Sequence, residues 1–379
     1  MMVVALSPQQ EVELQLVAAD ANDLVRAHRI TAAHPQGGIL VYAMLPLMGF
    51  FAEESYRYLR SVRPELPTPP LFCEFRRAVT KARAGLKLFD DNDGYADGVI
   101  DLLKLAHEKS VEWFCEPHVG PFRRFLRRYQ PDLGVFFVGE DVTATSHASL
   151  PAFGVTRDEL RDFTPADLDN LGARVKRYSY LVGDYTTTLA SQLMNFGLTV
   201  DTSPEVSTVD TPPITHNDFI GAKFYDLVRT PLEPIDASLV APVTMAAGHI
   251  NSAIRVLPAL LGKHSNLLLR AQLLTAYHAG EALRQTIPHV VEHAVPVPSF
   301  LCKRPLRNVC AHYGLRGAGP PAVGTTDPFC TVVQQLAGVS GATLRDALSE
   351  TLERYSEALR GALSKSKLAT ARARLGANS

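Results

Sequence analysis

The sequence predicts a mainly α-helical protein, in which a multi-helix N-terminal region precedes a C-terminal helical bundle. Apolar residues recur three and four positions apart through most of the 379-residue chain, as expected for helices with one buried face. Two helix starts, Ser7-Pro8 and Thr164-Pro165, place a capping hydroxyl before a proline at the first helical position. Only Leu133 to Gly139 has the composition of a good strand, and no second strand candidate stands near it. We therefore expect a buried extended segment there rather than part of a large sheet.

Residues 1–235 are predicted to form a mostly helical N-terminal domain. We expect helices over Pro8 to about His28, Ile39 to Val62, Cys73 to Leu88, Asp97 to Phe114, Pro121 to Tyr129 and Thr164 to about Phe196. Residues 200–240 are rich in serine, threonine and proline, which indicates a long connection bearing one short helix near Asp218 to Val228. This composition places a domain boundary at about residue 236. The role of the N-terminal domain is open: sensing, regulation and substrate selection all fit.

Residues 236–379 are predicted to form the helical bundle. The expected helices are Pro242 to Leu261 with a kink at Pro258, Leu267 to Ile287, a helix from about Pro305, Phe329 to Leu336, and Thr343 to Leu368. Ser265 stands at the expected start of the second of these helices. A glycine- and proline-rich loop, residues 314–327, is expected to end the helix that begins near Pro305.

Composition limits the classes of function. The chain is 46% hydrophobic and has a formal net charge of −1, so contact with RNA would have to use local basic patches rather than the field of the whole molecule. Its five cysteines have no framework spacing, which favours reduced thiols in a cytoplasmic protein. We expect no cofactor and no metal, because the cysteine-histidine pairs are isolated and the acidic run at residues 90–94 fails the calcium-loop pattern. We also expect no signal peptide and no membrane span.

The segment Arg307-Asn-Val-Cys-Ala-His312 carries the strongest chemical signal. Asn308 and His312 are four residues apart and would share one face of a helix, and the long side chain of Arg307 could reach the same site. A histidine can move a proton near neutral pH, and an arginine can bind a phosphate through two donors. Together they suit cleavage of RNA without a metal, with the 2′-hydroxyl of the RNA as the nucleophile.

Arg307, Asn308 and His312, followed by Tyr313-Gly314, resemble the active motif of the HEPN superfamily of ribonucleases. The segment Tyr277 to Leu283 in the preceding predicted helix resembles the packing partner of that motif. The resemblance covers about residues 240–379. It implies a homodimer in which two motifs build one RNase site, use in toxin or antiviral-defence systems, and a regulatory or antitoxin partner. Tyr313 directly follows the histidine, whereas the modified tyrosine of antitoxin-partnered toxins lies two positions after it.

The spacing alone is not specific, because Arg-x4-His also occurs at Arg29 to His34 and at Arg284 to His289. The match at Arg307 differs by its asparagine and by the Tyr-Gly ending. Candidate RNA contacts are Tyr313 and a basic stripe with interleaved aromatic residues, formed by Arg123, Arg124, Arg127 and Arg128. The surface of an amphipathic helix is the simpler explanation of this stripe, and the one that we favour.

The prediction with the most support is therefore a metal-independent endoribonuclease. The alternative is a non-catalytic HEPN-like module for dimerisation or ligand binding, which the near-neutral charge favours. A third alternative is a purely structural helical protein in which the pattern is a coincidence.

Overall fold

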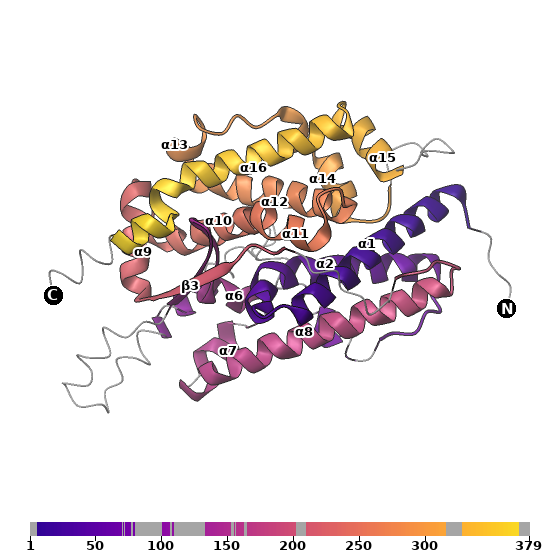
Figure 1. The fold of residues 1–379 in the computed structure, drawn as a ribbon, viewed down its shortest axis with the longest axis horizontal. Coiled ribbons are helices and arrows are strands. Elements are labelled where there is room, and N and C mark those ends of the chain that lie inside the picture. The colour runs from indigo at the N-terminus through magenta and orange to yellow at the C-terminus, as the bar shows by residue number, and fades with distance from the viewer. Residues whose placement is uncertain are drawn as a thin grey trace.

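The computed structural model describes residues 6–69, 71, 73–76, 79, 101–106, 108–109, 133–152, 155, 157–162, 165–201, 210–315 and 328–370. Helices make up most of these residues, and a single small sheet accompanies them, which confirms the predicted mainly α fold (Figure 1). Within these ranges, no helix combines the length and apolar character needed to cross a membrane. The predicted helix Pro121 to Tyr129 lies outside the described residues, as do most of the predicted helices Cys73 to Leu88 and Asp97 to Phe114.

Three long helices from the N-terminal half pack together in one layer: α1 (Pro8–Ala33), α2 (Gly37–Val62) and α8 (Pro165–Met194) (Figure 1). Helix α1 begins where the sequence predicts. The Ser7 hydroxyl accepts from the Gln10 backbone N–H, and the Gln10 side chain accepts from the Ser7 backbone N–H, which is a complete capping box. The helix ends at Ala33, five residues beyond the predicted end at His28.

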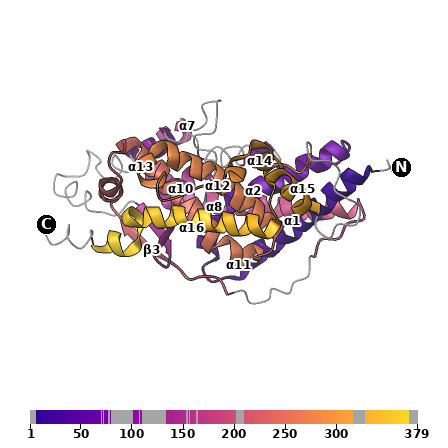
Figure 2. The same ribbon diagram turned by 90° about the horizontal axis from the view of Figure 1, so that it is seen from above.

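The second layer comes from the C-terminal half, and its main helices are α10 (Val240–Arg255), α11 (Leu257–Leu261), α12 (Asn266–Thr286), α14 (Arg304–Ala311), α15 (Pro328–Ala337) and α16 (Gly341–Leu363). Figure 2 shows α16 running beside α10 and α12, both of which it contacts. The Ser265 hydroxyl caps α12 as predicted, and the chain breaks between α10 and α11 at Val256, just before Pro258. Shorter elements are α6 (Ser146–Ala152), α7 (Arg157–Asp162), α9 (Gly221–Arg229), α13 (Pro288–Val291) and the 3-10 turns Thr230–Leu232, Ala237–Leu239 and Ser299–Cys302.

The predicted strand exists, but the expectation that it lacks partners is wrong. Strand β1 (Leu133–Val138) is the centre of a three-stranded antiparallel sheet, with β2 (Asp141–Thr145) on one side and β3 (Ile214–Phe219) on the other. Strand β3 is polar between its two buried end residues, Ile214 and Phe219, because it lies at the edge of the sheet. Its composition therefore gave no strand pattern.

The predicted boundary near residue 236 does not separate two hydrophobic cores among the described residues. One apolar cluster includes residues from both sides of this position, such as Leu24 of α1 and Leu268 of α12. Helix α1 contacts α11 and α12, and α2 contacts α10. Side chains of α1 and α2 can therefore reach the end of α14.

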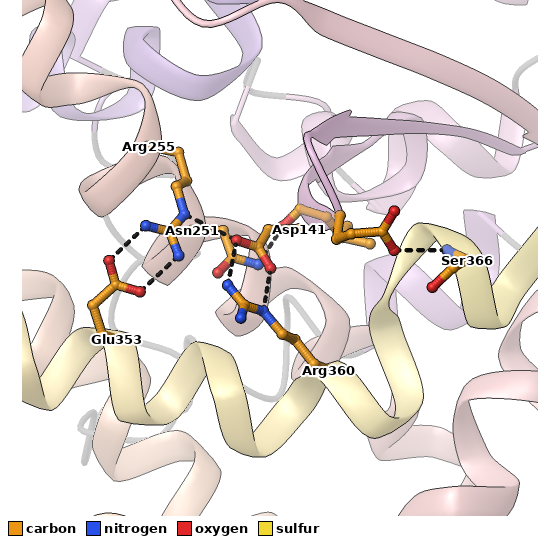
Figure 3. Close-up of polar contacts among 8 residues, drawn as sticks. Asp141, Asn251, Arg255, Glu353, Arg360 and Ser366 are labelled. Carbon is orange, nitrogen blue, oxygen red and sulfur yellow. Dashed lines mark hydrogen bonds and ion pairs between the residues drawn. The ribbon is translucent and has the colours of Figure 1, made fainter.

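Asp141 joins the sheet to the second layer (Figure 3). Its carboxylate, 5% exposed, accepts hydrogen bonds from Arg255 of α10 (Nε to Oδ2, 2.9 Å) and Arg360 of α16 (Nε to Oδ1, 2.9 Å). Arg255 also donates to both oxygens of Glu353, and Asn251 donates to the backbone carbonyl of Val142, the residue after Asp141. Burial opposes ionisation of Asp141, but the hydrogen bonds from Arg360 and Arg255 lower the pKa of its carboxyl below the usual value.

Asp141→Asn is expected to lower the free energy of unfolding at pH 7 by about 2 kcal/mol, because the charge-assisted hydrogen bonds from two arginines lose their anion. The pKa of Asp141 is lower in the folded state, so its stabilisation is present above the usual value of 3.8 and disappears as the pH falls below it. Urea denaturation at pH 7 and at pH 3 measures both effects. The control is Asp158→Asn, since Asp158 is 89% exposed in its pair with Arg161. Equal midpoints for the two variants at pH 7 would contradict the prediction.

Candidate active site at the end of helix α14

The predicted motif lies on α14 and just beyond it. The helix starts at Arg304 with Pro305 in its first turn and ends at Ala311. His312 caps it, with an extended backbone (φ −127°, ψ 157°) and an N–H that donates to the Asn308 carbonyl at 2.9 Å. The expectation that His312 and Asn308 share one face of a continuous helix is therefore wrong, because the chain leaves the helix at the histidine. This turn directs the imidazole toward α2.

His312 pairs with a carboxylate that is not among the predicted site residues. Its Nδ1 lies 2.8 Å from Oε2 of Glu54 in α2, a residue 258 positions away. The Glu54 side chain is 5% exposed and the His312 side chain is 39% exposed. When Glu54 is ionised its oxygens only accept, so Nδ1 is then the donor of this contact and Nε2 of that neutral tautomer keeps its lone pair. This arrangement presents a base at a partly open surface, with its orientation set by a buried acceptor.

Arg307 and Asn308 lie one turn before the histidine on α14. The guanidinium carbon of Arg307 is 5.2 Å from the centroid of the Tyr277 ring on α12, a cation–π distance, and Asn308 is exposed. The structure thus brings the segment that begins at Tyr277 into contact with the motif helix, as the sequence predicted. The guanidinium of Arg307 therefore packs on the Tyr277 ring, and the exposed amide of Asn308 lies next to it in the chain.

Tyr313 does not suit the predicted contact with RNA. The side chain is buried at 1% exposure, its hydroxyl donates to Oδ2 of Asp20 at 2.8 Å, and it accepts from the Ser55 hydroxyl at 2.9 Å. Burial raises the pKa of this phenol. Tyr313 therefore anchors the chain directly after His312 and is not available to stack on a base.

A buried ion pair lies beneath Tyr313. Arg270 of α12 and Asp20 of α1 are both fully buried, and Arg270 donates through Nη1 to Asp20 and through Nε to the Cys310 carbonyl at 2.9 Å. The guanidinium packs 4.2 Å from the centroid of the Tyr313 ring and 4.6 Å from that of Phe51. Burial raises the pKa of the Cys310 thiol to about 12, so this cysteine in the motif is not a nucleophile near neutral pH.

Two arginines surround the buried acidic residues of α2. Nη1 of Arg57 lies 3.0 Å from Oε1 of Glu54, and its Nε lies 4.0 Å from Oε1 of Glu53. Nε of Arg76 lies 3.7 Å from the same Glu53 oxygen. The carboxylates are 5% and 7% exposed, whereas Arg57 and Arg76 are 49% and 59% exposed. Solvent at this edge of the site therefore meets guanidinium groups rather than carboxylates.

The other two Arg-x4-His matches have structural roles. His34 ends α1, where its Nδ1 accepts from the Gln36 backbone N–H and its Nε2 lies 2.7 Å from the Thr211 hydroxyl. Nε2 of His289 lies 3.0 Å from the Leu232 carbonyl, a distance at which the imidazole donates to that oxygen. Arg284 donates to Tyr355 and Glu281. Neither match combines an open imidazole with a buried carboxylate.

Two further site predictions concern the basic stripe and the absence of a metal. The basic stripe of Arg123, Arg124, Arg127 and Arg128 lies outside the described residues. Within the part of the chain that is described, no group of three or more histidine, cysteine or acidic side chains is arranged to hold a metal. Comparison with protein-family models, with curated proteins and with solved structures found no match.

Proposed function

We propose that this protein is a metal-independent endoribonuclease of the HEPN type, which cleaves RNA by attack of the 2′-hydroxyl on the neighbouring phosphorus. The observation that carries the proposal is the pair formed by His312 and Glu54, at the end of the helix that bears Arg307 and Asn308. A half-exposed imidazole oriented by a buried carboxylate is an arrangement suited to general base catalysis.

In this mechanism, Nε2 of His312 takes the proton of the 2′-hydroxyl while its oxygen forms a bond to phosphorus. The bond from phosphorus to the 5′ oxygen then breaks, and that oxygen gains a proton to leave as a hydroxyl. The products are a 2′,3′-cyclic phosphate and a 5′-hydroxyl. Arg307 binds the non-bridging oxygens and stabilises their growing charge, and Asn308 donates a hydrogen bond to the phosphate. Glu54 stabilises the imidazolium that forms on His312.

The leaving oxygen needs an acid on the opposite side of the phosphorus, and one imidazole cannot serve both sides in a single step. A homodimer that brings together two copies of the α14 end would supply a second His312 for this purpose. We propose such a dimer, acting on cytoplasmic RNA as a toxin or antiviral-defence effector that a regulatory or antitoxin partner restrains. The alternative function, a non-catalytic dimerisation or ligand-binding module, uses the same surface without the proton transfer.

The test is incubation of the purified protein with single-stranded RNA in EDTA. We expect cleavage that leaves cyclic phosphate ends, and no cleavage where the nucleotide 5′ to the scissile bond carries a 2′-deoxy or 2′-O-methyl sugar. Arg307→Ala should lower kcat/KM by about 10²-fold, because one donor to the transition-state charge is lost. Cleavage of the 2′-deoxy substrate, or wild-type activity in Arg307→Ala, would contradict the proposal. A dimer that binds RNA without cleaving it would support the alternative.

A further inference from the structure

We infer that Arg57 of α2 is a second phosphate-binding residue of this site, which holds the RNA backbone next to the scissile phosphate. The inference rests on the proposed function and deepens it, because it assigns part of the RNA-binding surface to the N-terminal half of the chain. Position, orientation and charge each support it.

The position follows from the hydrogen bonds of Glu54. One carboxylate oxygen, Oε2, lies 2.8 Å from Nδ1 of His312, and the other, Oε1, lies 3.0 Å from Nη1 of Arg57. A single carboxylate group therefore separates the imidazole from the guanidinium. Arg57 therefore lies on the Glu54 side of the imidazole, and this is where we place the RNA backbone next to the scissile phosphate.

The guanidinium of Arg57 has N–H donors that its described contacts do not use. An arginine carries five N–H groups, and the described contacts of Arg57 engage Nη1 in a hydrogen bond and bring Nε only to 4.0 Å from Glu53, beyond hydrogen-bond range. The side chain is 49% exposed, so the remaining donors can reach a ligand in solvent. The bond to Glu54 holds the group in place before RNA arrives, which reduces the entropy lost on binding.

The charges at this edge favour a phosphate, although α2 contributes two glutamates. Glu53 and Glu54 are nearly buried, whereas Arg57 and Arg76, which pair with them, are exposed. The formal net charge of the whole chain is −1, so it provides no general attraction for RNA. Loss of one local cation should therefore be visible in binding.

The test compares Arg57→Gln with wild type in binding of a fluorescein-labelled, fully 2′-O-methyl oligoribonucleotide, followed by anisotropy at several salt concentrations. Glutamine can still donate to Glu54, so the His312 pair keeps its geometry. We expect Kd to rise about fivefold and the slope of log Kd against log salt to fall by about 0.7, the value for one lost phosphate contact on a single strand. Arg57→Lys should recover part of the loss. In cleavage of unmodified RNA, KM should rise while kcat stays within about threefold.

Arg354→Gln is the matched control. Arg354 lies on α16, pairs with Glu350 four residues before it, and is 42% exposed, but it has no contact with the motif. If Arg57→Gln matches Arg354→Gln in Kd and in salt slope, the inference is overturned, whether or not RNA is cleaved. Failure of the wild-type protein to bind the oligonucleotide would also overturn it. If the protein binds RNA through Arg57 but cleaves none, the inference stands and the proposed function fails.

Discussion

His312→Ala is expected to lower kcat/KM for RNA cleavage by about 10³-fold or more, because the substitution removes the base that we propose for the 2′-hydroxyl proton. Glu54→Gln tests the same chemistry without removing the imidazole. The amide oxygen can still accept from Nδ1, but the negative charge that stabilises the imidazolium is gone, and the amide NH2 can favour the wrong tautomer. We expect a loss of about 10²-fold in kcat for this variant. Single-turnover cleavage of an end-labelled RNA at saturating protein measures both effects on the chemical step.

His289→Ala is the control, because it occupies the same spacing after Arg284 but donates only to a backbone carbonyl. It should cleave RNA at the wild-type rate. The melting temperature of each variant, measured by circular dichroism, separates a loss of chemistry from a loss of fold. A Glu54→Gln enzyme that keeps full activity would show that the carboxylate is only a structural partner of His312, and a fully active His312→Ala protein would exclude the proposed mechanism.

The sequence predicted those parts of the fold that depend on neighbouring residues. The capping hydroxyls of Ser7 and Ser265 stand three residues before the N–H groups that they accept from, so the starts of α1 and α12 follow from local pattern. Edge strand β3 could not be predicted in this way, because its pairing partner β1 lies about 80 residues earlier and its exposed positions are polar. The segment before residue 236 looked like a linker, yet Gln36 makes two hydrogen bonds to Ile214 there.

The same distinction applies to the site. Arg307, Asn308 and His312 are visible as a local pattern, whereas Glu54 and Arg57 reach it from α2 only after the two layers pack. One signal was present, since two acidic residues end the most apolar stretch of the N-terminal half, and buried carboxylates need partners. The wrong prediction for Tyr313 has a related cause. Adjacency to His312 suggested exposure, but the ring covers the buried Arg270.

Removal of either member of the Asp20–Arg270 pair is expected to cost about 3–5 kcal/mol of the free energy of unfolding, the largest stability effect we predict in this chain. Both side chains are fully buried, so Asp20→Ala would leave a guanidinium without its counter-ion among the rings of Phe51 and Tyr313. Urea denaturation followed by circular dichroism measures the loss. The control is Arg177→Gln, which breaks an exposed pair with Glu74 and should leave the midpoint almost unchanged.

A double variant separates the destabilisation caused by one unpaired buried charge from the contribution of the ion pair to the free energy of unfolding. Asp20→Leu with Arg270→Met replaces both ions by apolar groups of comparable size, and we expect it to be more stable than either single variant. It should nevertheless cleave RNA more slowly than wild type, because Tyr313 loses the carboxylate that its hydroxyl donates to, and the Cys310 carbonyl loses the Arg270 donor. Both contacts hold the chain on either side of His312. If the double variant regains both stability and full activity, the buried pair stabilises the fold without positioning His312. If it regains stability but has a lower kcat and an unchanged KM, the pair positions His312.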